Sequence, residues 1–237
     1  MLQTKNASTL LEAPNTFAAL GAPVASASSA RSLVAMPLSK WLFDKSLAII
    51  GLAVLSPVML GVACAIRLGG PGPVTYGHTR IGKNGVPFKC LKFRTMRPGS
   101  DDALIELLDI DPIARDEWNE QRKLERDPRV DSVGMFLRKT SLDELPQFWN
   151  VLRGDMSIVG PRPITADEMS KYGTHIAAYK SVRPGITGIW QVSGRSDASY
   201  ERRVALDTDY VNTRNFRTDV SIVLRTFKVV ASRRGAV

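Results

Sequence analysis

The strongest constraint on this chain is one long apolar run. Ser46 to Ile66 spans 21 residues without a charge, and a single helix of that length would be about 31 Å long at roughly 1.5 Å per residue. Such a helix is long enough to cross the hydrocarbon core of a bilayer. Ser56-Pro57 lies at its centre, where proline removes the amide that would bond the carbonyl of Ala53 and its ring crowds that turn. The sequence therefore predicts a membrane segment with a sharp bend.

Charges beside this run leave two topologies open. Lys40 and Lys45 precede it and Arg67 follows it, whereas a simple crossing favours basic residues on the cytoplasmic side only. One hypothesis is a re-entrant hairpin that enters the membrane, breaks at Ser56-Pro57 and returns to the same face. The other is a kinked helix that crosses, since membrane helices tolerate proline. A buried core helix is disfavoured, because such helices seldom run this long without a charge.

Composition indicates a globular protein with an anionic partner. The 237 residues are 44% hydrophobic and 23% charged, which excludes disorder throughout. Lysine and arginine total 32 against 23 acidic residues, a formal charge of +9, so nucleic acid, anionic lipid or a phosphorylated substrate is expected to bind. The two cysteines and two histidines, Cys64, Cys90, His78 and His175, are too few for a disulfide framework or a histidine-rich metal site.

Three regions follow from these patterns. Residues 1–36 are rich in Ala, Ser and Thr and are expected to form a mobile tail; the apolar stretch comes too late for a secretory signal. Residues 37–67 contain the predicted re-entrant hairpin, and residues 68–237 have the composition of a mixed soluble domain.

Turn and helix signals give a coarse fold for residues 68–237. Asn84-Gly85 separates two extended runs and predicts a two-stranded ribbon. Residues 100–126 read as helical with an interruption at Pro112, and residues 222–230 read as part of an amphipathic helix. The fold class is therefore α+β and helix-rich, with a small β-ribbon.

The second arm of the ribbon interleaves basic and apolar residues: Lys89, Lys92, Arg94 and Arg97 with Phe88, Leu91, Phe93 and Met96. Such a basic ribbon suits phosphate, anionic lipid or single-stranded nucleic acid. The plain alternative is a solvated strand face over a core.

The hexamer from Ser141 to Pro146 contains two adjacent carboxylates, Asp143 and Glu144. Ser141 and Glu144 have the spacing of a capping box, and Asp143 would favour the positive end of a helix. Alternatively, two carboxylates about 100° apart on a helix could serve different tasks at one catalytic centre. The hexamer alone leaves both interpretations open.

Two further segments have features of a ligand-binding loop. Arg162 stands between Pro161 and Pro163, which restricts its backbone and presents a guanidinium to phosphate at little ordering cost. The stretch 183–195 is punctuated by glycines and contains Trp190, and it is suited to a base or a sugar. Tight turns and a core tryptophan are the structural alternative.

In combination these segments resemble the bacterial sugar transferase family, the monotopic phosphoglycosyl transferases. The resemblance rests on the bent apolar run and on four motifs in family order: Lys92-Phe93-Arg94-Thr95-Met96, Arg138 to Gln147, Gly160-Pro161-Arg162-Pro163, and Pro184 to Gly188. It covers residues 37–237 and is closest to the short form, which includes the exopolysaccharide-initiating galactose-1-phosphate transferases.

The resemblance implies an activity and a location. The expected reaction transfers a sugar 1-phosphate, with galactose as the first guess, from a UDP-sugar to undecaprenyl phosphate and releases UMP. The expected location is the cytoplasmic face of the bacterial inner membrane, with membrane lipids as further partners. A homodimer is left open, and no nucleic acid is expected. The break at Ser56-Pro57 matches the element that makes the family's hairpin re-entrant.

The resemblance also implies roles for individual residues. Asp143 matches the nucleophile that forms a covalent phosphosugar intermediate, and Glu144 matches a base or a positioning group for the lipid phosphate. Arg138 matches a phosphate-contacting position and Arg162 a nucleotide-binding position. Further candidates for substrate binding are Lys92, Arg94, Gln191 and Arg195.

The implied chemistry requires a cation. A carboxylate about 4 Å from a phosphate charge is repelled by roughly 4 kcal/mol at an effective dielectric of ~20. Mg²⁺, held by Asp143 and phosphate oxygens, is the expected cofactor, and Arg138 and Arg162 share the remaining charge. Two alternatives belong to other classes: a noncatalytic module that binds anionic lipid, and a nucleic-acid-binding protein.

Overall fold

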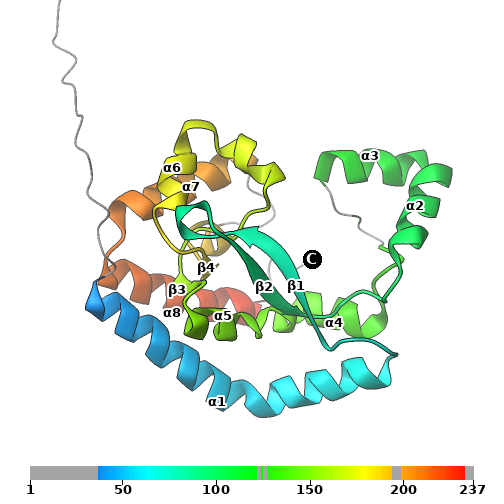
Figure 1. Cartoon of the computed structure of the whole chain (residues 1–237), viewed down its shortest axis with the longest axis horizontal. Helices are drawn as coiled ribbons and strands as arrows, with labels where there is room; N and C mark the ends of the chain where they lie inside the picture. The colour runs from blue at the N-terminus through cyan, green and yellow to red at the C-terminus, as the bar shows by residue number, and fades with distance from the viewer. Residues whose placement is uncertain (1–36, 122–123, 125–126, 194–198, 233–237) are drawn as a thin grey trace, which may run out of the picture. The chain divides into compact units, whose positions relative to one another are not determined.

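The apolar run forms one bent helix, α1 (Leu38–Leu68), which contains 31 residues and continues through Pro57. The predicted break into two helices is therefore wrong, and Figure 1 shows instead a bend near the middle of the helix. The Ser56 hydroxyl donates a hydrogen bond to the Ala53 carbonyl (2.8 Å). That carbonyl is the acceptor that Pro57 leaves without an amide partner. The side chain beside the proline thus helps to keep the helix continuous where the sequence alone predicts an interruption.

The remaining elements confirm the helix-rich α+β prediction. The structure is a computed structural model that describes residues 37–121, 124, 127–193 and 199–232, so the predicted tail at 1–36 lies outside the described residues. After α1 come, in chain order, β1 (Thr75–Ile81), η1 (Lys83–Gly85), β2 (Pro87–Phe93), α2 (Asp101–Ile110), α3 (Pro112–Gln121), α4 (Ser132–Thr140), η2 (Leu142–Glu144), α5 (Gln147–Arg153), β3 (Ser157–Val159), η3 (Asp167–His175), α6 (Ile176–Lys180), β4 (Gly185–Thr187), η4 (Trp190–Val192), α7 (Tyr200–Thr213) and α8 (Phe216–Ser232), where η marks a 3₁₀ turn.

The predicted ribbon is confirmed. β1 and β2 pair antiparallel, and the turn between them holds Asn84 at φ 59° and Gly85 at φ 78°, the left-handed conformations that this dipeptide accepts. Side chains alternate between the two faces of a strand, so Lys92 lies on the same face as Cys90 and Lys89 on the opposite one. The basic residues of this arm are therefore divided between the two faces of the ribbon.

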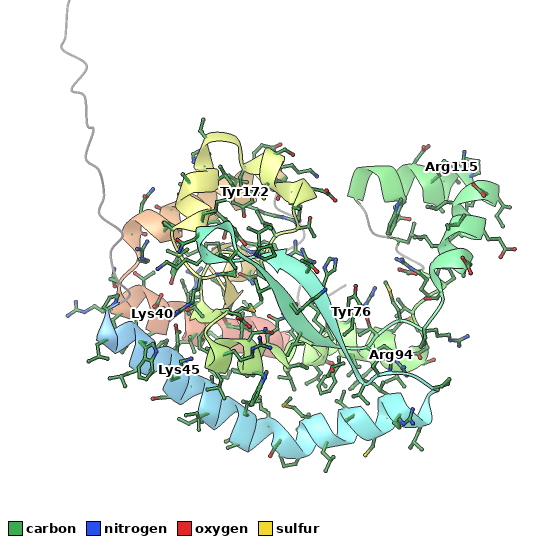
Figure 2. The ribbon with its side chains drawn as sticks, in the orientation of Figure 1. Lys40, Lys45, Tyr76, Arg94, Arg115 and Tyr172 are labelled. Carbon is green, nitrogen blue, oxygen red and sulfur yellow. The ribbon has the colours of Figure 1, made fainter. Side chains whose placement is uncertain are left out.

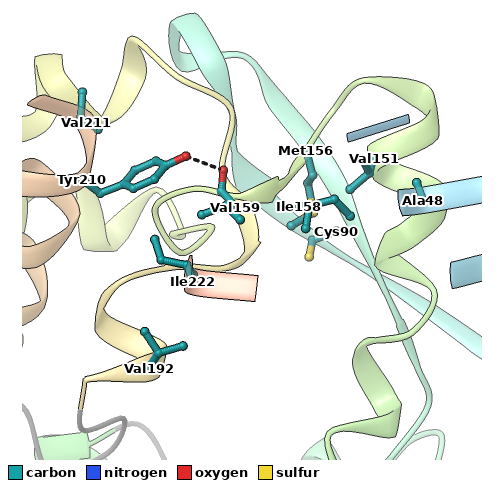
Figure 3. Packing of buried hydrophobic residues seen from close by; sticks show 10 residues of the cluster. All are labelled: Ala48, Cys90, Val151, Met156, Ile158, Val159, Val192, Tyr210, Val211 and Ile222. Atoms are coloured by element: carbon teal, nitrogen blue, oxygen red, sulfur yellow. Dashed lines mark hydrogen bonds between the residues drawn. The ribbon is translucent and has the colours of Figure 1, made fainter. Parts of the chain in front are cut away.

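The main core lies between α5, β3 and the two C-terminal helices. Figure 3 shows its buried side chains, among them Val151, Met156, Val159 and Ile222. The Tyr210 hydroxyl donates a hydrogen bond to the Val159 carbonyl (2.9 Å) at the edge of this core. β3 and β4 pair in parallel, and this pairing orders the segment that leads into Arg162.

The N-terminal part of α1 is attached to the unit by buried polar contacts. Asp44 is 2% exposed, and its Oδ1 accepts hydrogen bonds from Lys40 Nζ (3.0 Å), Ser157 Oγ (3.1 Å) and the Ile158 amide (3.1 Å). Lys40 Nζ also lies 2.9 Å from Asp219 Oδ2 of α8. Lys40 and Lys45 lie on the side of α1 that faces the other helices in Figure 2.

The C-terminal part of α1 is attached as well. Val62 and Ile66 pack with Phe93 and Leu137, and the Arg94 guanidinium donates hydrogen bonds to the carbonyls that end the helix: Ile66 (3.2 Å), Gly70 (3.1 Å) and Pro71 (2.6 Å). Both ends of the bent helix therefore contact the same compact unit. Between them, Val54, Val58 and Leu60 have exposed side chains.

The helical stretch after the ribbon is interrupted at Pro112, as predicted. The Asp111 carboxylate ends α2 and begins α3, because its Oδ1 accepts hydrogen bonds from the amides of Ile113 (2.9 Å) and Ala114 (3.2 Å). The predicted C-terminal helix is α8, which begins at Phe216.

Candidate active site

Asp143 and Glu144 lie in the 3₁₀ turn η2, directly after α4. Ser141 ends α4 in the left-handed conformation, at φ 57°, and its side chain makes no capping hydrogen bond. The capping-box interpretation is therefore wrong: Glu144 Oε1 accepts a hydrogen bond from Lys92 instead. Asp143 is buried, at 8% exposure, which is unusual for a carboxylate whose only task is to end a helix.

Lys92 of β2 bridges the two carboxylates. Its Nζ lies 2.7 Å from Glu144 Oε1 and 3.3 Å from Asp143 Oδ2. Burial by itself lowers the pKa of Lys92, but Glu144 and Asp143 outweigh it and hold the pKa above its ordinary value. The ammonium is therefore firmly charged, and it neutralises part of the acidic pair.

The pKa of Asp143 is raised, chiefly by burial and further by the neighbouring Glu144 charge, while Lys92 and Arg138 act in the opposite direction. Arg138 lies in the last turn of α4, and its Nε donates a hydrogen bond to Thr95 Oγ1 (3.1 Å). The structure thus gathers Asp143, Glu144, Lys92 and Arg138, residues that are up to 52 positions apart in the sequence.

Arg162 belongs to a second, positively charged group. Its guanidinium lies 5.8 Å from the centre of the Trp190 ring, and within the described part of the chain no ion pair or hydrogen bond engages it. Arg203 lies 4.9 Å from the same ring. Arg80, which pairs with Glu168 at 3.3 Å, has a pKa lowered by burial and by the Arg162 charge.

The ribbon connects the two charged groups. Burial raises the pKa of Cys90 to about 11, and the charges of Lys92, Glu144, Arg80 and Arg162 all act on this thiol. In the β1–β2 register, Arg80 stands opposite Phe88, four residues along β2 from Lys92, or about 13 Å at the usual strand rise. An acidic pair and an arginine group therefore lie along one face of the ribbon.

Other predicted residues lie elsewhere or have other contacts. Arg94 closes the end of α1, as described above, and Gln191 Nε2 donates a hydrogen bond to the Ile186 carbonyl (3.1 Å). Arg195 lies outside the described residues. Ser56 and Pro57 are in the bend of α1.

Arg80 and Arg203 were missed in the sequence. Arg80 lies on the same face of β1 as His78 and Tyr76, and Tyr76 stands opposite Lys92 in the register. The alternation of side chains along β1 could therefore have placed Arg80 on the face that carries Lys92. Arg203 lies in an ordinary helical segment, α7, and nothing in its local sequence separates it from other helical arginines.

The acidic pair suits a metal ion only if phosphate oxygens of the substrate complete its coordination. Among the described residues, no group of three or more His, Cys, Asp or Glu side chains is placed to hold a metal ion. Asp143 and Glu144 do supply the carboxylate oxygens that Mg²⁺ prefers, and such ions commonly complete their coordination with phosphate oxygens and water. The donor set therefore suits a magnesium–phosphate complex and does not suit a metal bound by protein alone.

Comparison with known proteins identifies the family of this chain. The sequence profile described as bacterial sugar transferase matches residues 35–233. The chain is 49% identical over 199 residues to exopolysaccharide production protein ExoY of Sinorhizobium fredii, covering 84% of this chain and 88% of that protein. It is also 49% identical over 194 residues to undecaprenyl-phosphate galactose phosphotransferase of Salmonella typhimurium, covering 82% of this chain and 40% of that protein. A third relative is the UDP-glucose:undecaprenyl-phosphate glucose-1-phosphate transferase of Escherichia coli, with 40% identity over 191 residues and coverage of 77% and 38%.

These matches define the protein as an enzyme of sugar transfer. The chain belongs to the bacterial sugar transferase family, as the resemblance in its motifs predicted. Membership of an enzyme family does not favour the noncatalytic alternative.

Proposed function

We propose that this protein transfers a sugar 1-phosphate from a UDP-sugar to undecaprenyl phosphate, with release of UMP, as a first step of exopolysaccharide assembly. The observation that carries the proposal is the buried carboxylate of Asp143 beside Glu144 and bridged by Lys92, in a chain that is 49% identical to a protein named undecaprenyl-phosphate galactose phosphotransferase.

In the proposed first step, a carboxylate oxygen of Asp143 attacks the phosphorus that bears the sugar. An oxygen–phosphorus bond forms on Asp143, the phosphoanhydride bond breaks, and its electron pair leaves with UMP. In the second step, an oxygen of the lipid phosphate attacks the same phosphorus and the aspartyl bond breaks, which returns the carboxylate. Covalent catalysis lets a soluble donor and a membrane-held acceptor react in turn at one centre.

The surrounding charges have distinct tasks in this scheme. Lys92 and Arg138 oppose the rise that burial causes in the pKa of Asp143, and they reduce its repulsion from the diphosphate. Arg162, whose charge also acts on the buried carboxyl of Asp207, is proposed to bind the nucleotide phosphate. Glu144 orients the lipid phosphate or takes up its proton.

Magnesium is proposed as the cofactor. Held by Asp143 and phosphate oxygens, it would neutralise charge on the donor diphosphate. Lys92 and Arg138 would then need to offset only the remaining charge.

The membrane placement is proposed to be re-entrant, at the cytoplasmic face of the inner membrane. α1 is the one described helix long and apolar enough to cross a bilayer, and only 11% of its apolar window is buried. A crossing helix carries its two ends to opposite faces, but Asp44 near one end and Ile66 near the other both contact the same unit. The apex around Pro57 is therefore the part that enters the lipid.

α8 extends the proposed lipid contact. Phe216, Leu224 and Phe227 are 53%, 59% and 70% exposed on this helix, and Arg217, Arg225 and Lys228 border the same surface hollow as Phe216 and Leu224. The Phe216 ring meets Phe43 of α1 edge to face at 5.4 Å. An apolar face with a basic border, continuous with a membrane helix, suits the surface of an anionic bilayer.

Galactose is the preferred sugar. Relatives named for galactose are 49%, 47% and 42% identical to this chain, whereas two named for glucose are 40% and 39% identical. Galactose and glucose are epimers, so a few contacts are enough to distinguish them. Competition between UDP-galactose and UDP-glucose tests this preference directly.

The decisive experiment omits the lipid. Purified protein is incubated with UDP-galactose or UDP-glucose and Mg²⁺, and we expect one equivalent of UMP and a hexose-phosphate adduct on Asp143, detected by mass spectrometry. Asp143→Asn removes both, whereas Asp209→Asn, at an exposed position of α7, removes neither. UMP release that requires undecaprenyl phosphate would contradict the two-step exchange.

A further inference from the structure

Asn150 makes an unusual set of contacts beside the site. It lies in α5, six residues after Glu144, and is 0% exposed. Its Oδ1 accepts a hydrogen bond from the Leu91 amide (2.9 Å), and its Nδ2 donates to the Lys89 carbonyl (2.8 Å) and to Asp155 Oδ2 (3.1 Å). A buried carboxamide is thus satisfied on both its oxygen and its nitrogen.

Two of these bonds reach the backbone of the strand that carries Lys92. The Lys89 carbonyl and the Leu91 amide belong to residues two apart on β2, and in an antiparallel pair such groups point to the same edge of the strand. The Asn150 side chain therefore binds the outer edge of β2 much as one peptide of a further strand would. Lys92 follows Leu91 directly, so its backbone position relative to α5 is set one residue away.

Helix α5, which carries Asn150, follows closely after the turn that carries the two carboxylates. α5 begins at Gln147, three residues after η2 ends at Glu144, and α5 and β2 pack against each other. We propose that Asn150 is a positioning residue that holds the Lys92 ammonium against Asp143 and Glu144. This inference rests on the proposed function in so far as it concerns catalysis, because the carboxylate that Lys92 bridges is the proposed nucleophile.

A purely structural asparagine would behave differently from a positioning one. Val151, the next residue of α5, is 1% exposed and belongs to the main core, but its side chain makes no hydrogen bond to β2. Val151→Ala is therefore a matched variant, since it loosens the same helix and leaves the link to β2 in place. Asn150→Ala removes the link.

A double-mutant cycle with Lys92→Met separates the two roles. The measured quantity is the single-turnover rate of UMP release from UDP-galactose, with each variant assayed at a fixed interval below its own Tm. We expect Asn150→Ala to lower this rate at least ~10-fold when Lys92 is present and less than ~2-fold in the Lys92→Met background, because residues that act as a unit are not additive. Val151→Ala is expected to have the same small effect in both backgrounds. An equal loss from Asn150→Ala in both backgrounds would overturn the proposal.

A second variant separates the acceptor of the Asn150 side chain from its donor. Asn150→Asp keeps the acceptor for the Leu91 amide and removes the donor to the Lys89 carbonyl. The same non-additivity with Lys92→Met is expected, and additivity would again overturn the proposal.

A readout that needs no turnover separates this proposal from the proposed function. The rate at which an amine-reactive ester acylates Lys92 is followed by peptide mass spectrometry in the full-length protein. We expect Lys92 to react at least ~3-fold faster in either Asn150 variant than in Val151→Ala, since its ammonium is no longer held between two carboxylates. If the unmodified protein releases no UMP from any donor, the proposed function fails while this labelling still tests Asn150. Equal labelling in all variants would refute the positioning role whatever the activity.

Discussion

Replacing Lys92 with methionine removes the only described cation in direct contact with both carboxylates and keeps the length of the side chain. The Lys92 Nζ lies 3.3 Å from Asp143 Oδ2. At an effective dielectric of about 20, two unit charges at that separation attract by about 5 kcal/mol. The Lys92 side chain is 34% exposed, so water screens part of this attraction. An opposite charge at such a distance commonly lowers a carboxyl pKa by about 1 to 3 units. We therefore expect the pKa of Asp143 to rise by a similar amount when Lys92 is replaced.

The sign of the effect on activity follows from the role of Asp143. Burial raises the pKa of this carboxyl and Lys92 lowers it, so loss of Lys92 raises it further. The nucleophile must be ionised, and the rate falls as pH falls through its pKa. We therefore expect the acid limb of the pH–rate profile to move upward by about 1 to 3 pH units, with about a tenfold loss of ionised enzyme per unit below the new pKa.

The assay is single-turnover UMP release from about pH 5 to pH 9. Lys92→Arg retains the charge and is expected to keep most of the acid limb in place. Lys89→Met is the matched control, because Lys89 lies on the opposite face of β2 and its Nζ donates a hydrogen bond to Thr79 Oγ1 (2.8 Å). An unchanged acid limb in Lys92→Met, or an equal shift in Lys89→Met, would refute the reasoning.

Three further predictions concern stability and membrane binding. Gly134→Ala drives a Cβ into the Thr95 carbonyl oxygen, so we expect a loss of about 1 to 3 kcal/mol in the free energy of unfolding, measured by denaturation in detergent; Gly61→Ala, where an added Cβ meets no atom within 4 Å, should cost nothing. Burial raises the pKa of Asp207 to about 7, so the folded state binds this proton more tightly than the unfolded chain, and stability should fall as pH rises from about 4 to about 7. Asp207→Asn should remove that slope, and a slope that persists unchanged in thermal unfolding would contradict the assignment. Leu224→Gln should weaken binding to anionic vesicles severalfold in co-sedimentation. Ile105→Gln, in α2 and 58% exposed against 59% for Leu224, should leave binding intact; equal effects would argue against α8 as a lipid contact.

Features decided by neighbouring residues could be predicted from the sequence. The turn at Asn84-Gly85 needs two residues that tolerate positive φ, and the helix interruption at Pro112 needs a proline and a carboxylate to begin the next helix. Both requirements are met within a few residues, so tertiary contacts do not alter either the turn or the helix interruption. The bend at Pro57 was predicted for the same reason.

Features decided by distant residues could not be predicted. Whether Glu144 caps a helix or binds Lys92 depends on how β2 packs against α5, and the left-handed conformation of Ser141 leaves Glu144 free of the capping role. The Arg162 and Arg203 contacts with Trp190 likewise depend on packing between α7 and η4. The family resemblance named Asp143, Glu144 and Lys92 as separate candidates, and only the tertiary structure places Lys92 against both carboxylates.

The position of the acidic pair beside α1 has a simple sequence cause. Leu142 and Leu145 are three residues apart, a spacing that brings two side chains to one side of a helical turn, while the residues between them point to the other side. Both leucines pack in the cluster that contains Ile66 of α1, and Asp143 and Glu144 face Lys92. One turn therefore has an apolar side against α1 and a charged side toward the ribbon. Because the two leucines fix the turn on α1, the carboxylates are held beside the helix that we propose enters the lipid.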